Sequence, residues 1–79
     1  MNKLEQYKNL VITTNTETIL ANIDLIQKYS EKISRLKRHE YSYFFKDNIR
    51  RYEKTIQELN QEDEILLKEI EEIEEMKEV

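Results

Sequence analysis

Residues 12–33 read ITTNTETILANIDLIQKYSEKI, and the spacing of the isoleucines in this stretch decides the fold. Isoleucine recurs every seven positions, with one further isoleucine between the repeats: Ile12, Ile19, Ile26 and Ile33, with Ile23 between them. A seven-residue apolar repeat places its members along one face of a helix that packs against another helix. The repeat therefore predicts a long helix over about residues 2–40.

A second apolar repeat follows the first and predicts a second helix over about residues 43–79. Its members alternate in steps of four and three, and the only polar residue among them is Asp63: Phe45, Ile49, Tyr52, Ile56, Leu59, Asp63, Leu66, Ile70 and Ile73. The phase changes within residues 39–43, where we place the connection. Ser42 is a residue type that caps the N-terminus of a helix, so we expect it to cap the second helix.

The chain contains no glycine and no proline, the residues that tight hairpins and bulges of β-sheets require. We therefore predict an all-α fold in which residues 1–79 form a single domain, an antiparallel helical hairpin that resembles a coiled coil. With a turn near residue 41, core partners should have numbers that add to 82. This register places Ile33 opposite Ile49 and Ile19 opposite Asp63, where the aspartate either fixes the register as a buried polar group or lies near the surface.

The first helix has one weak stretch, the Thr-Thr-Asn-Thr sequence of residues 13–16, because these residues are poor helix formers. A break there would give three helices. Neither a glycine nor a proline enforces such a break, so we expect a continuous helix.

Further apolar residues lie outside the predicted seam between the helices: Leu20, Leu25, Tyr29, Leu36, Phe44, Ile65 and Leu67. A lone hairpin would leave them exposed to water. We expect them to pack against a second copy, giving a homodimer that is a helical bundle; the alternative is a docking face for a different protein.

The net charge of −4 conceals a strong separation of charge along the chain. Residues 32–54 hold eight basic residues and three acids, which gives +5, whereas residues 55–79 hold two basic residues and ten acids, which gives −8. The hairpin therefore has a positive pole at its turn and a negative pole at its open end.

The positive pole also carries aromatic residues, and basic side chains beside aromatic rings are typical of sites that hold phosphates and stack bases. This gives a hypothesis of nucleic-acid binding, with these candidates: Arg35, Lys37, Arg38, Tyr41, Tyr43, Lys46, Arg50 and Arg51. The alternative is a solvated basic face around an aromatic turn. The acidic balance of the whole chain favours this alternative, because domains that bind nucleic acid are usually basic.

The acidic row near the C-terminus favours a different function, a small helical regulator or inhibitor that binds another protein. Carboxylates on a rigid helix can dock on a basic partner, and apolar side chains can add contact area. The candidates for this role are Leu25, Tyr29, Leu36, Glu69, Glu71, Glu72, Glu74 and Glu75. Two alternatives are a solvated acidic face and a structural role as an assembly or scaffold factor.

Other classes of function find no support in the sequence. His39 is the only histidine, cysteine is absent, and no glycine-rich loop is available to hold phosphate, so we expect no enzyme, no metal site and no cofactor. We expect a cytoplasmic protein, because no apolar segment reaches the length of a membrane span or of a signal peptide. The abundance of lysine, asparagine and isoleucine is typical of AT-rich coding sequences, as in low-GC bacteria and their phages, and it favours a chain encoded by a phage or another mobile element.

Overall fold

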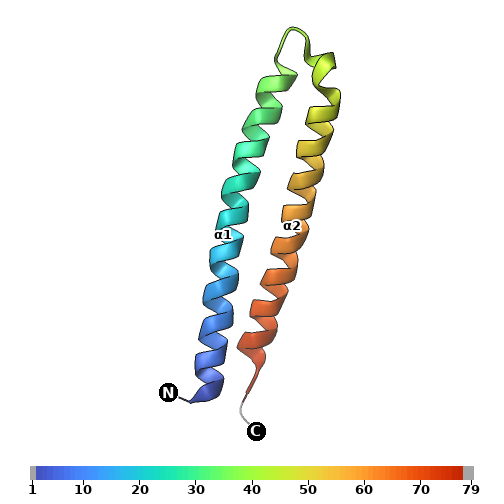
Figure 1. The fold of residues 1–79 in the computed structure, drawn as a ribbon. Helices are drawn as coiled ribbons and strands as arrows, with labels where there is room; N and C mark the ends of the chain where they lie inside the picture. The colour runs from blue at the N-terminus through green and yellow to red at the C-terminus, as the bar shows by residue number, and fades with distance from the viewer. Residues whose placement is uncertain (1, 78–79) are drawn as a thin grey trace.

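The computed structural model describes residues 2–77 as two long helices joined by a short turn (Figure 1). Helix α1 spans Lys3–Lys37, the 3-10 helix η1 spans Ser42–Phe45, and helix α2 spans Lys46–Glu75. The helices lie side by side and run in opposite directions, giving a rod whose Cα atoms extend over 62 × 16 × 12 Å. We call the end with the turn the tip, and the end where α1 begins and α2 ends the open end. The predicted all-α helical hairpin is confirmed.

Helix α1 is continuous, and its start is capped. The side chain of Asn2 accepts a hydrogen bond from the backbone N–H of Glu5 at 2.8 Å, which satisfies one of the free donors of the first turn. The helix passes unbroken through residues 13–16. The hydroxyl of Thr18, two residues after this weak stretch, donates to the backbone carbonyl of Thr14 at 3.2 Å, so it finds its partner inside the helix.

The turn at the tip differs from the predicted one. Residues 42–45 form a 3-10 turn, so α2 begins at Lys46, and no side chain caps it. The expected cap by Ser42 is therefore wrong. His39 organises the turn instead: its Nδ1 accepts a hydrogen bond from the backbone N–H of Tyr41 at 3.0 Å, and its ring meets that of Phe45 edge to face at 5.3 Å.

Helix α2 ends at Glu75, earlier than the expected end at residue 79. Residues 78 and 79 of that prediction lie outside the described part of the chain. Up to that point α2 follows its predicted repeat, because every position of the repeat from Phe45 to Ile73 is buried or half-buried.

The seam of α1, meaning the row of side chains that faces α2, differs from the predicted isoleucine repeat. Ile26 and Ile33 belong to it, but Ile23 is 51% exposed, so its predicted place in the seam is wrong. In the isoleucine repeat Ile23 precedes Ile26 by three residues, whereas in the observed seam Asn22 precedes Ile26 by four. Towards the open end, the seam of α1 is therefore shifted by one residue relative to the isoleucine repeat. The observed seam of α1 includes Leu4, Val11, Asn15, Thr18, Asn22, Ile26, Tyr29, Ile33 and Leu36.

This shift changes the partner of Asp63. The aspartate is buried, with 9% of its surface exposed, and its Oδ1 accepts a hydrogen bond from Nδ2 of Asn22 at 2.9 Å. Asn22 thus takes the place that the predicted register gave to Ile19. A hydrogen-bonded polar pair inside an apolar seam disfavours slipped registers, because a slip would leave both groups buried without a partner.

The apolar core of the hairpin is thin. Within residues 2–77 the buried apolar side chains are Ile33, Ile49 and Ile73, and each keeps 8–9% of its surface exposed. No described side chain is completely buried. Two helices cannot surround a side chain, so much apolar surface remains available for other contacts.

Candidate protein-docking groove at the open end

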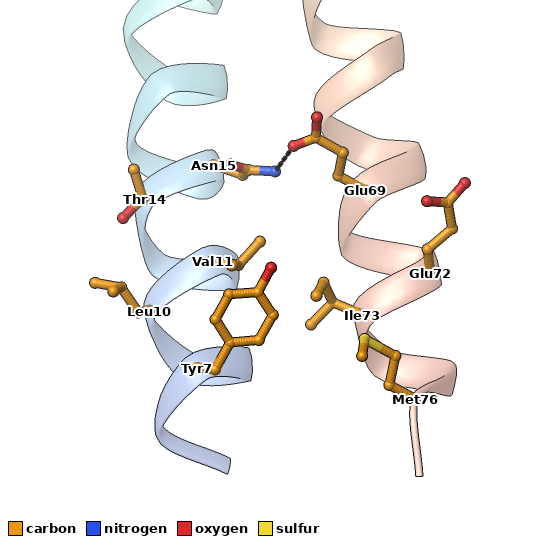
Figure 2. A pocket seen from close by; sticks show the side chains of 9 residues that line it. All are labelled: Tyr7, Leu10, Val11, Thr14, Asn15, Glu69, Glu72, Ile73 and Met76. Carbon is orange, nitrogen blue, oxygen red and sulfur yellow. Dashed lines mark hydrogen bonds between the residues drawn. The ribbon is translucent and has the colours of Figure 1, made fainter. Parts of the chain in front are cut away.

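A groove with a volume of 640 Å³ runs between α1 and α2 at the open end. Figure 2 shows Tyr7, Val11, Ile73 and Met76 between the two helices, with Leu10 and Glu72 at the outer sides. The lining residues are Tyr7, Leu10, Val11, Thr14, Asn15, Glu69, Glu72, Ile73 and Met76.

The helical repeat explains why these residues meet. On α1, Tyr7, Leu10 and Thr14 follow steps of three and four, so their side chains lie on one face of the helix. On α2, Glu69 and Glu72 are three residues apart and lie on the flank of the seam that faces the same side, and Met76 follows directly after the end of the helix. The antiparallel pairing then brings the first three turns of α1 beside the last two turns of α2.

The floor and walls of the groove are apolar and largely open to water. Ile73 closes the floor and is buried, whereas Tyr7, Leu10 and Met76 keep 52%, 66% and 44% of their surfaces exposed. All three line the same groove, unlike the single apolar residues that any protein surface carries. They offer apolar area to a second molecule.

Polar side chains close the inner end of the groove and give it a negative edge. Nδ2 of Asn15 donates to the carbonyl of Leu66 at 3.2 Å and to Oε2 of Glu69 at 2.9 Å, the contact drawn in Figure 2. Glu72, one turn towards the open end, is exposed. The ammonium group of Lys8 donates to the carbonyl of Met76 and so ties the end of α2 to α1.

The structure distributes the predicted partner-binding carboxylates over more than one face of α2. Glu69 and Glu72 line the groove. Glu71, Glu74 and Glu75 are exposed but do not line it. They extend the negative surface around the open end without touching the space that a partner would fill.

The predicted apolar stripe outside the seam is partly wrong. Tyr29 and Leu36 are half-buried members of the seam, and the ring of Tyr29 stacks on that of Tyr52 with 5.4 Å between the ring centres. The ammonium group of Lys32 lies 5.7 Å from the centre of each of these rings. Leu25 is 38% exposed, so of these three partner-binding candidates it has the largest exposed fraction.

The tip brings together the residues of the nucleic-acid hypothesis. All eight are exposed at the last turns of α1, in the turn, or at the first turns of α2: Arg35, Lys37, Arg38, Tyr41, Tyr43, Lys46, Arg50 and Arg51. Phe44, which is 68% exposed, lies between the two tyrosines, with ring centres 6.1 Å from Tyr41 and 4.3 Å from Tyr43. The rings therefore pack on one another as a cluster surrounded by cations.

Sequence reasoning missed the apolar part of the groove, which consists of Tyr7, Leu10, Val11 and Met76. A signal was present, because Leu4, Tyr7 and Val11 follow steps of three and four and extend an apolar face to the start of α1. The isoleucine repeat begins only at Ile12 and predicts a different face of α1 as the seam.

Other kinds of site find no geometry in the described residues. Within residues 2–77 no group of three histidine, cysteine, aspartate or glutamate side chains is arranged to hold a metal ion. Neither α1 nor α2 contains an apolar stretch that could cross a lipid bilayer. Comparison of the chain with models of protein families, with curated proteins and with solved structures found no match.

Proposed function

We propose that this protein is a small cytoplasmic regulator or inhibitor that binds another protein through the groove at its open end. The observation that carries the proposal is the exposed apolar surface of Tyr7, Leu10 and Met76 beside the carboxylates of Glu69 and Glu72. An apolar surface with a charged edge on a rigid scaffold is typical of sites that bind a peptide or a helix.

The chemistry of the groove defines the kind of partner. An amphipathic helix would lay its apolar side chains, spaced three and four residues apart, over Tyr7, Leu10 and Met76. Lysine or arginine on the flank of that helix would meet Glu69 and Glu72. A helix has a diameter of about 10–12 Å with its side chains, and we expect the partner helix to lie along the groove between α1 and α2.

The wider acidic surface supports fast association with such a basic partner. The ten acids and two basic residues of residues 55–79 create an attractive field around the groove. Opposite charges steer encounter and raise the association rate, whereas the apolar contacts mainly determine how long the complex lasts. The two parts of the surface therefore have separate kinetic effects.

One substitution with a matched control tests the apolar part. We expect Leu10→Glu to weaken partner binding at least tenfold, because it places a charge against the partner's apolar face. Leu20→Glu is the control, since Leu20 lies on the same helix, is 61% exposed and does not line the groove. Partners captured from host extract are identified by mass spectrometry, and their affinities for all three proteins are measured by interferometry. Equal affinities of the two variants would contradict the proposal.

A second series tests the acidic part. Changing Glu69, Glu71, Glu72, Glu74 and Glu75 to glutamine should leave the helix content nearly unchanged, since the two residue types have similar helix propensities. We expect slower association with the captured partner and little change in dissociation, measured by stopped-flow fluorescence. Circular dichroism checks the fold. Association that does not change would show that the acidic surface only keeps the protein in solution.

The tip supports one alternative function, the binding of nucleic acid. Tyr41, Tyr43 and Phe44 are each at least half exposed among the basic side chains of the tip, an arrangement that can stack bases and hold phosphates. This alternative expects a mobility shift with single-stranded DNA or RNA at low salt, lost when Arg35, Arg38, Arg50 and Arg51 are changed to glutamate. No shift by the unmodified protein at low salt would eliminate it.

A further inference from the structure

The side of the hairpin opposite the groove carries a second exposed apolar surface. Residues that flank a seven-residue seam fall on two sides of it. The flank on the groove side holds Tyr7 and Thr14 on α1, Glu69 on α2, and Met76 just after the end of α2. The opposite flank carries the residues that we call the back face: Ile12, Ile19 and the adjacent Ile23 on α1, and Leu67 on α2.

The back face is open to water in the single chain. Ile23 is 51% exposed and Leu67 is 50% exposed, while Ile12 and Ile19 are half-buried. The seven-residue repeat places the four side chains on the same flank of the seam, from the middle of the rod towards its open end, so they make up one apolar patch across both helices. Such a patch indicates a contact surface.

We infer that the back face packs against the back face of a second copy, with the two hairpins antiparallel, so that the tip of each lies beside the open end of the other. This arrangement is a four-helix bundle. It goes beyond the proposed function because the groove lies on the other side of each hairpin and stays open in the dimer.

The dimensions of the hairpin suit such a pairing. The rod is 62 Å long and 16 Å wide between Cα atoms, so two hairpins packed along their length have room for an interface of standard size, in which each partner buries roughly 800 Å². The hairpin also has a reason to pair, because its own seam completely buries no described side chain. A four-helix bundle would surround side chains that a two-helix hairpin leaves at the surface.

The separation of charge determines the orientation. A parallel pair would place two tips, each carrying the +5 of residues 32–54, side by side, and would do the same with two acidic C-terminal segments. The antiparallel pair places each positive tip beside a negative open end. Because unlike charges attract and like charges repel over the distances between packed helices, the antiparallel pair has the lower energy.

Individual side chains on the edges of the back face follow the same pattern. The flanking positions of the repeat carry Lys37 and Lys46 near the tip, and Glu71 and Glu74 near the open end. All four side chains are exposed, and none of them forms an ion pair within residues 2–77. The ion pair found in that range joins Lys28 and Asp24 at 3.3 Å. The charges of the four flanking side chains are available to a second copy.

Sedimentation equilibrium tests the pairing itself. We expect the unmodified protein at micromolar concentration to have twice the chain mass of 9.7 kDa. Ile23→Glu should raise the dissociation constant of the dimer at least tenfold. Ile65→Glu is the matched control, because Ile65 is 59% exposed on α2 and lies away from the back face. A monomer at all concentrations, or equal weakening by both variants, would overturn the inference.

Spin labels test the orientation on a protein with an intact back face. The sequence contains no cysteine, so Arg38→Cys gives one label at the tip and Leu20→Cys gives one near the middle of the rod. In the antiparallel dimer the two tip labels should be separated by most of the 62 Å rod length, whereas the two central labels should be close together. A short distance between tip labels would overturn the antiparallel arrangement.

A charge exchange gives an independent test and separates this inference from the proposed function. Lys37→Glu with Lys46→Glu should weaken the dimer, and adding Glu71→Lys and Glu74→Lys should restore it. A parallel dimer would instead be strengthened by the first pair of changes, which would overturn the inference. Leu10→Glu should leave the dimer mass unchanged, so loss of partner binding and loss of dimerisation are measured by different variants.

Discussion

The half of the hairpin near the tip and the half near the open end are built from the same two helices but hold together by different contacts (Figure 1). Near the tip, Ile33 and Ile49 are buried and the rings of Tyr29 and Tyr52 stack. Towards the open end, the two most buried residues of α1 are asparagines, and both donate hydrogen bonds to carboxylates of α2.

If the open end binds a partner as we propose, this difference separates stability from recognition. Apolar burial supplies most of the free energy of folding, whereas a hydrogen-bonded polar pair adds less net stability but favours one register. The open-end half therefore holds the helices in a fixed register while leaving Tyr7, Leu10 and Met76 exposed. In the tip half the apolar side chains of the seam face one another, and the apolar surface left open to a partner is the aromatic cluster of Tyr41, Tyr43 and Phe44.

The largest effect on stability should come from the tip half. We expect Ile33→Ala to lower the free energy of unfolding by about 3 kcal/mol, because it removes buried methyl groups and leaves a cavity. Leu20→Ala is the matched control in the same helix, since Leu20 is 61% exposed, and it should cost less than about 1 kcal/mol. Both changes are made in the Ile23→Glu variant, which we expect to be monomeric. Urea denaturation at fixed protein concentration then measures the loss in free energy of unfolding without a contribution from dimerisation.

A smaller effect is expected from the polar pair of the open-end half. Asn22→Ala leaves the buried carboxylate of Asp63 without its 2.9 Å donor, which should cost about 1–3 kcal/mol. Asn60→Ala, a change of the same kind at an exposed position, should cost little. A loss for Asn22→Ala no larger than that for Asn60→Ala would show that the pair does not hold the two helices together.

Replacing both members of the pair should separate stability from register. We expect Asn22→Leu with Asp63→Leu to leave the hairpin as stable as the unmodified protein or more stable, because two apolar groups replace a desolvated polar pair. The gain should come with a less well-defined register, visible as doubled or broadened amide signals of α1 in NMR spectra. A single sharp set of signals would assign the register to the apolar layers alone.

The smallest effect concerns the two helix starts. Helix α1 is capped by Asn2 at the open end, whereas α2 begins at the tip without a side-chain cap. Asn2→Ala should cost about 1 kcal/mol and increase hydrogen exchange in the first turn of α1 only. Faster exchange throughout the open-end half would show that the cap supports the groove as well.

The sequence predicted the hairpin because both helices carry long apolar repeats and no residue that breaks a helix. It predicted the seam of α2 correctly, since that helix keeps strict steps of four and three. It misplaced part of the seam of α1, because the isoleucine repeat leads through Ile23, while the folded chain buries Asn22. An asparagine is stable in a seam when a hydrogen-bond partner on the other helix faces it. The sequence alone does not show which carboxylate of α2 faces Asn22.

The candidate site was predictable only in its charged part. The row of glutamates near the C-terminus is visible in the sequence, and Glu69 and Glu72 do line the groove. The apolar surface of the groove depends on the pairing of the two chain ends, since Leu10 and Met76 are 66 positions apart and lie at one groove only after the hairpin closes. No local pattern in the sequence contains this relation.

The claim that recognition belongs to the open end is tested most directly by NMR titration of the isotope-labelled protein with two probes. One probe is a synthetic amphipathic helical peptide with leucines on one face and lysines on its flanks, and the other is a single-stranded oligonucleotide. We expect the peptide to shift the amide signals of Tyr7, Leu10, Val11, Ile73 and Met76, and the oligonucleotide to shift none. Shifts confined to Tyr41, Tyr43 and Phe44 with the oligonucleotide, and none with the peptide, would contradict the account.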